Sequence, residues 1–424
     1  MKMNKLIFLI LLLIAAPFAR AQIVDVTALQ KEIDDKNQKI QALNVEIAKY
    51  QNLASQASDK GLSLKQQINV LEQSRKALTL EITKIQTKID STNLSIKQLS
   101  SKITDSKNKI GSLQDGLEKS IREISQNDNF HVVINLLNNK TFSDFFGKLD
   151  EQSQFNASVQ DKVNQIKNEK QKLETNKTAV EKTKQQLSDL QKELTGKKKV
   201  VEVTKTEQQK TLIDTKSEEA NYQKLLADAT AKKTAFEKEI FDYESKIKFQ
   251  LDPNSIPQSG SSPLMWPVDN VRITQLFGKT VGAKKLYVSG SHNGVDFGVP
   301  IGTTVKALAS GIVAGTGDTD LECRRVSFGR WVLIKFNNGL AATYGHLSVI
   351  SVKAGDKVDA GQIIGYSGNT GYSTGPHLHI SAYVATAVNV VTRPSSSCPG
   401  RSLTMPVSAV DAYLDPVLYF PPKP

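Results

Sequence analysis

The 424-residue sequence predicts a long α-helical coiled coil followed by an all-β domain, an antiparallel β-sandwich. Proline is absent between Pro17 and Pro253, whereas 20 of the 25 glycines lie from Gly260 onward. Proline interrupts helices and glycine marks turns, so this distribution indicates two halves of different fold class. A heptad pattern in the first half and short β-branched segments in the second support the same division.

The first residues have the features of a Sec-type signal peptide. Lys2 and Lys5 precede the apolar run Leu6–Ala16, and Ala19-Arg-Ala21 forms a cleavage site. The apolar run is well short of the roughly twenty residues that span a bilayer, so a permanent anchor is the less favoured alternative. We therefore expect residues 1–21 to be removed and the protein to act outside the cytoplasm, in the periplasm or cell envelope.

Residues 22–250 predict the coiled coil. Apolar residues recur with alternating spacings of four and three from Leu64 to Ile124, where fourteen of the eighteen positions are apolar. A weaker pattern covers Leu29 to Tyr50, and a less regular one resumes after Val159. The pattern indicates two long helical arms. The alternative is a passive spacer or a parallel homodimer.

The heptads break near residues 127–154. Two apolar clusters, Phe130–Leu137 and Thr141–Phe146, lie in this break and predict a hairpin tip or a regulatory knob between the arms. His131 lies here, far from the other histidines, and is interpreted as a structural residue.

Residues 251–263 are rich in proline, serine and glycine and predict a linker between two domains. Short β-branched segments separated by glycine turns then run through residues 264–424, as in Thr303–Ala307 and Arg330–Phe336. This alternation is typical of an antiparallel β-sandwich, and about 160 residues are enough for one hydrophobic core.

Four of the five histidines of the chain lie in three short motifs of the β domain. A catalytic zinc ion takes three nitrogen or oxygen ligands and keeps a fourth position open for water. His292, Asp296 and one histidine of the His377-Leu-His379 motif can supply these ligands. Residues two apart in a strand point to the same face, so His377 and His379 would enter one pocket and spacing alone leaves either as the ligand. His346 is a candidate general base or transition-state stabiliser.

These motifs resemble the lysostaphin-type (LytM-like) zinc metallopeptidases, which cut peptides of peptidoglycan. The resemblance covers roughly Trp266 to Tyr383, and every polar residue of the family motifs is present. The segments that carry it are Trp266-Pro-Val, His292-Asn-Gly-Val-Asp-Phe-Gly298, Gly302–Ala307, Tyr344-Gly-His-Leu347, Gly361–Gly368 and Gly375-Pro-His-Leu-His-Ile380.

The resemblance implies that His292, Asp296 and His379 bind Zn²⁺, while His346 and His377 activate water and stabilise the oxyanion. It implies a zinc metalloendopeptidase that hydrolyses cross-links or stem peptides of peptidoglycan, for wall remodelling or daughter-cell separation. The rival hypothesis is a non-catalytic activator or scaffold for a murein amidase, because some relatives keep the fold without the ligands. A peptidase that acts on other proteins would share the same chemistry.

The helical half also resembles the coiled coils of EnvC-like and PcsB-like cell-division hydrolases, chiefly through Thr141–Phe146 inside a broken coil. That resemblance implies docking on an FtsEX-type membrane complex, with the coil holding the peptidase closed until the partner opens it. No segment of the sequence is recognisable as a plug for the zinc site.

Cysteine content and charge add two expectations. Cys323 and Cys398 both lie in loop-like stretches of an exported domain, so we predict that they form a disulfide; the alternative is two buried or free thiols. The net charge of +12 is spread along the chain, with 14 Lys+Arg against 10 Asp+Glu in residues 251–424. A dispersed charge of this kind is not the basic stripe of a nucleic-acid-binding protein.

Overall fold

The computed structural model describes residues 26–56, 63–126, 142–247, 249, 252–287 and 289–423. The predicted signal peptide and residues 127–141 of the predicted break at 127–154 lie outside the described residues, whereas residues 142–154 of that break belong to one continuous helix, Phe142–Thr215. The chain divides into two compact units, of which the first contains Ser91–Gln185 and the chain up to Asp35. The second contains Lys36–Asp90 and Gln186–Pro424.

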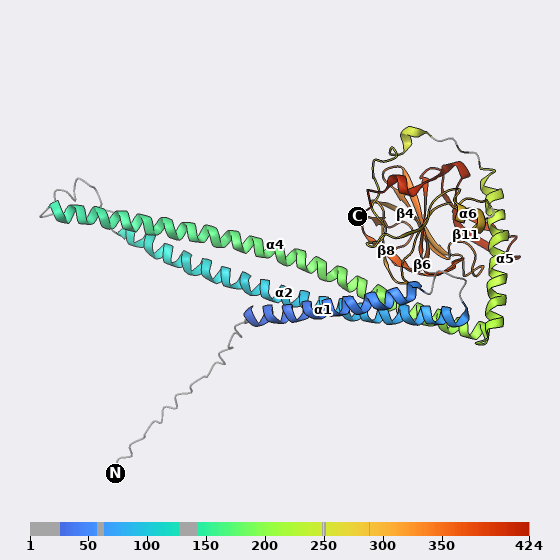
Figure 1. The fold of residues 1–424 in the computed structure, drawn as a ribbon. Helices are drawn as coiled ribbons and strands as arrows, with labels where there is room; N and C mark the ends of the chain where they lie inside the picture. The colour runs from blue at the N-terminus through green and yellow to red at the C-terminus, as the bar shows by residue number, and fades with distance from the viewer. Residues whose placement is uncertain are drawn as a thin grey trace, which may run out of the picture. The chain divides into compact units, whose positions relative to one another are not determined.

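Long helices fill the N-terminal half of the described chain (Figure 1). They are α1 (Val26–Gln56), α2 (Leu64–Gln126), α4 (Phe142–Thr215) and α5 (Glu219–Glu244). The prediction of long helices followed by an antiparallel β domain is confirmed. Of the helices described, none combines the length and the apolar character needed to cross a bilayer.

In the first unit, α2 and α4 are antiparallel partners joined by polar contacts. Glu169 of α4 is almost buried and accepts hydrogen bonds from Lys109 of α2 at 3.0 Å and from Ser106 at 3.3 Å. Hydrogen bonds from Lys172 and Lys109 lower the pKa of Glu169 to about 2. A buried carboxylate paired in this way favours one register of the two helices over registers shifted along the helix axis.

In the second unit, the heptad positions of α2 turn inward, and the base of the coil packs against the β domain. Leu71 and Leu78 of α2 form a cluster with Val200 of α4 and Tyr366 of the β domain. Lys197 of α4 is 5 % exposed, forms an ion pair with Glu81 of α2 at 2.5 Å, and donates to the carbonyl oxygen of Gly302. A Cβ atom at Gly196 would overlap the Tyr366 ring, so this contact requires glycine.

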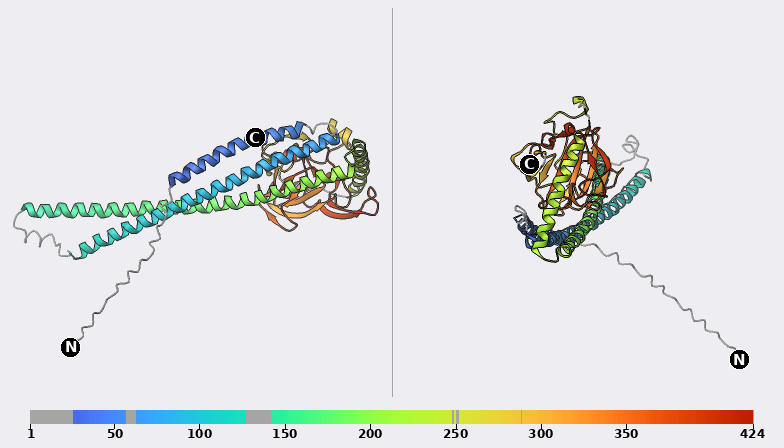
Figure 2. Two further views of the ribbon diagram at one scale, coloured as in Figure 1. Left: turned by 90° about the horizontal axis from the view of Figure 1, so that it is seen from below. Right: turned by 90° about the vertical axis from the view of Figure 1, so that its right-hand side faces the viewer.

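The β domain contains twelve strands among the described residues (Figure 2). They are β1 (Ile273–Gln275), β2 (Val295–Phe297), β3 (Thr304–Lys306), β4 (Gly311–Asp318), β5 (Arg330–Phe336), β6 (Leu340–Ile350), β7 (Lys357–Val358), β8 (Ile363–Ser367), β9 (Leu378–Val384), β10 (Asn389–Pro394), β11 (Ser402–Val407) and β12 (Tyr413–Leu414). The short helix α6 (Val281–Leu286) lies between β1 and β2.

Ten of these strands form one antiparallel sheet with the main order β1-β2-β9-β6-β5-β4-β7. Strand β6 is the branch point, because its first half pairs with β9 and its last residues pair with β8. The separate hairpin of β10 and β11 packs beside it. This topology puts β2, β9 and β6 side by side, and these three strands or their flanks carry every histidine of the predicted site.

The largest buried cluster of the β domain is drawn from residues of that domain alone. Phe297, Tyr344 and Leu378 lie in its centre and are fully buried. The hydroxyl oxygen of Tyr344 accepts a hydrogen bond from the backbone N–H of Leu308 at 2.8 Å. A core of this size can stabilise the sheet without the helices.

Cys323 and Cys398 form a disulfide, as predicted, with their Cα atoms 6.1 Å apart. The bond joins the turn after β4 to the loop between β10 and β11. Both cysteines lie in an apolar cluster that includes Trp331 of β5 and Phe236 of α5. The disulfide therefore fixes the β10–β11 hairpin where α5 packs against it.

Candidate metal centre and active site

Three side chains from adjacent strands form a compact ligand triangle. Asp296 of β2 and His379 of β9 are paired residues in the sheet, and His292 lies just before β2. His379 Nδ1 is 2.8 Å from Asp296 Oδ1 and 3.2 Å from His292 Nε2, and the third edge of the triangle is 3.4 Å. All three residues are buried.

The triangle matches the geometry of zinc. A tetrahedral Zn²⁺ bound at about 2.0–2.1 Å holds its ligand atoms roughly 3.3 Å apart, which is close to the three edges here. Burial alone would raise the pKa of Asp296, but the charge of His377 and hydrogen bonds from His292 and His379 hold this pKa well below its ordinary value. Two imidazoles and an ionised carboxylate are a suitable donor set for this metal.

Each imidazole of the triangle has a hydrogen-bond partner on its far side, and for His292 this partner fixes the tautomer. His292 Nδ1 lies 3.1 Å from the carbonyl oxygen of Leu276 and donates to it, which leaves Nε2 as the ligand atom. His379 Nε2 lies 2.8 Å from Ser381 Oγ, a hydroxyl that can accept its hydrogen and so is compatible with Nδ1 as the ligand atom. A Cβ atom at Gly294 would overlap the His379 ring, so the glycine between His292 and Asp296 lets the ligands close on one another.

The two remaining histidines lie beside the triangle. The rings of His346 and His377 have centroids 4.5 Å apart, and His377 Nε2 is 3.8 Å from Asp296 Oδ1. His377 Nδ1 donates to the carbonyl oxygen of Gly375 at 2.8 Å, and His346 Nδ1 donates to that of Thr370 at 2.8 Å. In the neutral form of each ring, the hydrogen on Nδ1 leaves Nε2 free to accept a proton.

The backbone of His346 is left-handed, with φ of 60° inside β6. This conformation is rare for a residue with a side chain, and it occurs where the pairing of β6 with β5 and β8 shifts register. Burial, followed by the charges of His377 and His379, lowers the pKa of His346 well below its ordinary value. The ring is therefore neutral near pH 7.

The structure thus brings together all five residues that the sequence singled out. His292, Asp296 and His379 form the triangle, while His346 and His377 line the same cavity of about 260 Å³. His131 lies outside the described residues. Which residue binds metal and which one transfers protons stays a prediction.

A comparison with protein families gives a matching domain. The model of Peptidase family M23 matches residues 290–390, the stretch that holds all five site residues. This chain contains an M23 peptidase domain. The likeness of the helical half to EnvC-like coils remains a prediction.

Individual relatives match the M23 domain over a similar stretch. The chain is 46 % identical over 91 residues to glycyl-glycine endopeptidase ALE-1 of Staphylococcus capitis, 21 % of this chain and 24 % of the relative. It is 46 % identical over 93 residues to peptidoglycan DD-endopeptidase ShyA of Vibrio cholerae, 22 % of this chain and 20 % of the relative. The chain thus spans about a quarter or less of the length of these curated relatives.

A solved structure covers more of the domain. The catalytic domain of lysostaphin from Staphylococcus simulans is 33 % identical, and the match covers 36 % of this chain and 93 % of that domain, with a TM-score of 0.26.

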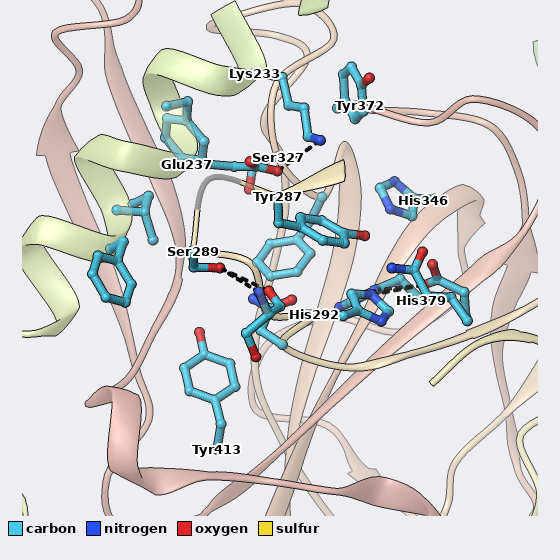
Figure 3. Close-up of a pocket in the computed structure, with 18 of the residues that line it drawn as sticks. Lys233, Glu237, Tyr287, Ser289, His292, Ser327, His346, Tyr372, His379 and Tyr413 are labelled. Carbon is cyan, nitrogen blue, oxygen red and sulfur yellow. Dashed lines mark hydrogen bonds and ion pairs between the residues drawn. The ribbon is translucent and has the colours of Figure 1, made fainter. Parts of the chain in front are cut away.

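Helix α5 covers the cavity of the M23 domain within the second unit (Figure 3). Lys233 and Glu237 lie one turn apart on α5, form an ion pair at 3.1 Å, and line the cavity. The Lys233 ammonium lies over the rings of Tyr287 at 4.7 Å and Tyr372 at 4.5 Å. Tyr287 in turn stacks on the ligand His292, with centroids 5.1 Å apart.

The sequence did not single out these four residues. Tyr287 lies five residues before the first ligand and Tyr372 five before His377, and aromatic residues flanking metal motifs are the pattern that could have indicated them. Lys233 and Glu237 have no such pattern, because charged residues are spread throughout the coil.

Proposed function

We propose that this chain is a zinc-dependent endopeptidase that hydrolyses peptide cross-links or stem peptides of peptidoglycan outside the cytoplasm. The observation that carries the proposal is the ligand triangle with two further imidazoles that each keep an open Nε2 toward it. Peptidoglycan is supported as the substrate by the named activity of the Vibrio cholerae relative. The cellular roles we propose are wall remodelling and daughter-cell separation.

The residues of the triangle would hold the ion. Zinc, when bound by His292, Asp296 and His379, supplies a Lewis acid that acidifies water and polarises a peptide carbonyl. Asp296 contributes its full negative charge because its pKa is held low. The hydrogen bond to the Leu276 carbonyl oxygen keeps His292 in the tautomer that binds metal, and Ser381 can accept the hydrogen of His379 Nε2 when Nδ1 binds the ion.

His377 and His346 would manage the protons. Nε2 of either ring can take a proton from the attacking water, because Nδ1 already carries the hydrogen donated to a backbone carbonyl. Once protonated, Nε2 can donate a hydrogen bond to the tetrahedral oxyanion and pass the proton to the leaving amine. The partial burial of His377, 16 % exposed against 7 % for His346, favours His377 as the ring that meets the substrate.

Helix α5 would gate the enzyme. Lys233 and Glu237 occupy the cavity where a peptide must lie to reach the ligands, so the docked helix and a substrate exclude each other. Gating of this kind fits an enzyme whose free activity would damage the wall of its own cell. An FtsEX-type membrane complex that acts through the coil is the partner we propose for its release.

The second candidate is an activator of a murein amidase. The cavity that α5 covers could also be a surface that a partner enzyme binds after α5 has left the β domain. Intact ligands favour the peptidase, because an activator does not need them.

Digestion of purified peptidoglycan tests the proposal. The test compares residues 22–424 with residues 252–424, which contain the largest buried cluster of the β domain. Each is assayed with and without a chelator, and products are identified by mass spectrometry. Chelator-sensitive peptide cleavage, faster for the shorter chain, is the expected result. Bound zinc with no cleavage by either chain would reject the peptidase and favour the activator.

A further inference from the structure

A carboxylate of α5 is held in a pocket of hydrogen-bond donors at the end of the β10–β11 hairpin. Glu239 Oε2 accepts the backbone N–H groups of Ser396 at 3.0 Å and Ser397 at 3.1 Å. It also accepts the hydroxyl groups of Ser395, Ser396 and Ser397 at 3.2, 2.8 and 3.0 Å. The guanidinium of Arg393 lies 3.4 Å from the other oxygen, Oε1. Arg393 and Ser395–Ser397 are called the carboxylate nest.

The nest is built by the β domain alone. Successive backbone N–H groups, hydroxyls and a guanidinium that converge on one point are a binding site for an anion. The hairpin fixes one side of the nest, and the disulfide at Cys398 fixes the other. Burial would raise the pKa of Glu239, but the hydrogen bonds of the serines and the charge of Arg393 lower it, so the bound carboxylate is ionised.

Glu239 fills the nest incompletely. All five hydrogen bonds go to one of its oxygens, while Oε1 is buried and has no hydrogen-bond partner. The Nη1 group of Arg393 is also buried without an acceptor. A guanidinium binds a carboxylate best through two parallel hydrogen bonds, which Glu239 does not make with Arg393. The donors of the nest therefore suit a carboxylate that enters from another direction.

The nest lies beside the cavity that holds the catalytic histidines. Glu239 lies one turn after the cavity-lining Phe236, on the same side of the helix. On the β domain, Met405 lines the cavity and pairs with Val391, two residues before Arg393. A peptide bound in the cavity could therefore place a neighbouring group in the nest once α5 has left.

We propose that the carboxylate nest is a binding site for a free carboxylate of a peptidoglycan stem peptide, which Glu239 replaces while α5 is docked. The assignment of the ligand rests on the proposed peptidase function. It follows that substrate and α5 compete for the nest as well as for the cavity. Substrates with a free carboxylate should bind better than amidated ones.

The test measures binding to the metal-free full-length chain, so it requires no turnover. The probe is acetyl-D-Ala-D-Ala, with its C-terminal amide as the matched control, and the readout is the backbone amide signals of Ser396 and Ser397 in nuclear magnetic resonance. A second peptide amide, whose single carboxylate is the side chain of a diamino acid, distinguishes a terminal from a side-chain carboxylate.

In Glu239→Ala, where the nest is free, we expect a carboxylate probe to shift both signals with an apparent Kd about tenfold lower than in the wild-type chain. The amide should shift neither. Adding Arg393→Met should remove the response, and adding Thr404→Ala, on the exposed face of the same hairpin, should not.

Equal responses to carboxylate and amide, or none to either carboxylate probe in Glu239→Ala, would overturn the inference and leave the nest as a latch for α5 alone. The proposed peptidase function is tested separately, by the cleavage of peptidoglycan. Cleavage of peptidoglycan without carboxylate binding would reject the nest as a subsite, whereas binding without cleavage would reject peptidoglycan as its source of ligand.

Discussion

Glu244, the last residue of α5, makes the docking of this helix depend on pH. Its carboxylate accepts the hydroxyl of Tyr413 at 2.8 Å and the backbone N–H of Ser408 at 3.3 Å. Burial raises the pKa of Glu244 from 4.5 to about 7, although these hydrogen bonds and the charge of Arg393 oppose the rise. When α5 leaves the β domain, the carboxyl returns to water and to its ordinary pKa.

The difference of pKa fixes the size and direction of the effect. Below pH 4.5 the carboxyl is protonated in both states, and docking carries no penalty from this group. Between pH 4.5 and pH 7 the docked state binds the proton more tightly, so docking weakens as pH rises, by about 3 kcal/mol in total. Above pH 7 the penalty is complete and constant.

Replacing Glu244 with glutamine keeps the shape of the side chain and removes its charge. We expect the free energy of α5 opening, measured by hydrogen exchange of α5 amides after correction for intrinsic rates, to fall by about 2.5 kcal/mol from pH 5 to pH 8 in the wild-type chain. In Glu244→Gln it should stay nearly level. A wild-type opening energy that does not change with pH, or an equal slope in the variant, would refute the reasoning.

Three further predictions concern the metal, the coil base and the disulfide. Asp296→Ala should lose zinc on dialysis, whereas His377→Ala should keep most of its zinc and lose about 100-fold or more in kcat; equal zinc loss, measured by atomic absorption, would contradict the assigned roles. Gly196→Ala, whose new methyl group would overlap Tyr366, should lower the free energy of unfolding in urea by about 1–3 kcal/mol. The control Gly111→Ala, with no atom within 4 Å, should be neutral or slightly stabilising, and equal effects would exclude overpacking as the cause. Replacing both cysteines by alanine opens a cross-link between positions 75 residues apart and should cost up to about 4 kcal/mol; an unchanged unfolding midpoint would show that the disulfide does not contribute.

The sequence predicted the fold class and singled out five residues that the structure brings together, because both follow from local patterns. The heptads of α2 and the absence of proline indicate helices. The four-residue spacing of His292 and Asp296 arises because His292 lies in the turn that leads into β2 and Asp296 lies in β2 itself. The partition between His377 and His379 needed the family resemblance, since both lie at the same face of β9.

The cover over the cavity could not be predicted in the same way. Helix α5 has the composition of the rest of the coil, and its decisive contacts join residues far apart in the chain, as between Glu239 and Ser396, 157 positions apart. The left-handed backbone of His346 could not be predicted from the sequence either. It lies where the pairing of β6 with β5 shifts register, and the residues beside it give no signal for that shift.

The corner between α4 and α5 has a mechanical consequence. Lys216 and Ser217 both adopt left-handed backbone conformations, with φ of 49° and 61°, although neither is glycine. Each such residue costs about 1–2 kcal/mol relative to a right-handed helix. The bend therefore stores roughly 2–4 kcal/mol that would be recovered if the two helices straightened into one. This conformational energy favours a straight helix over the bend. A partner that frees α5 from the β domain would therefore be assisted by it.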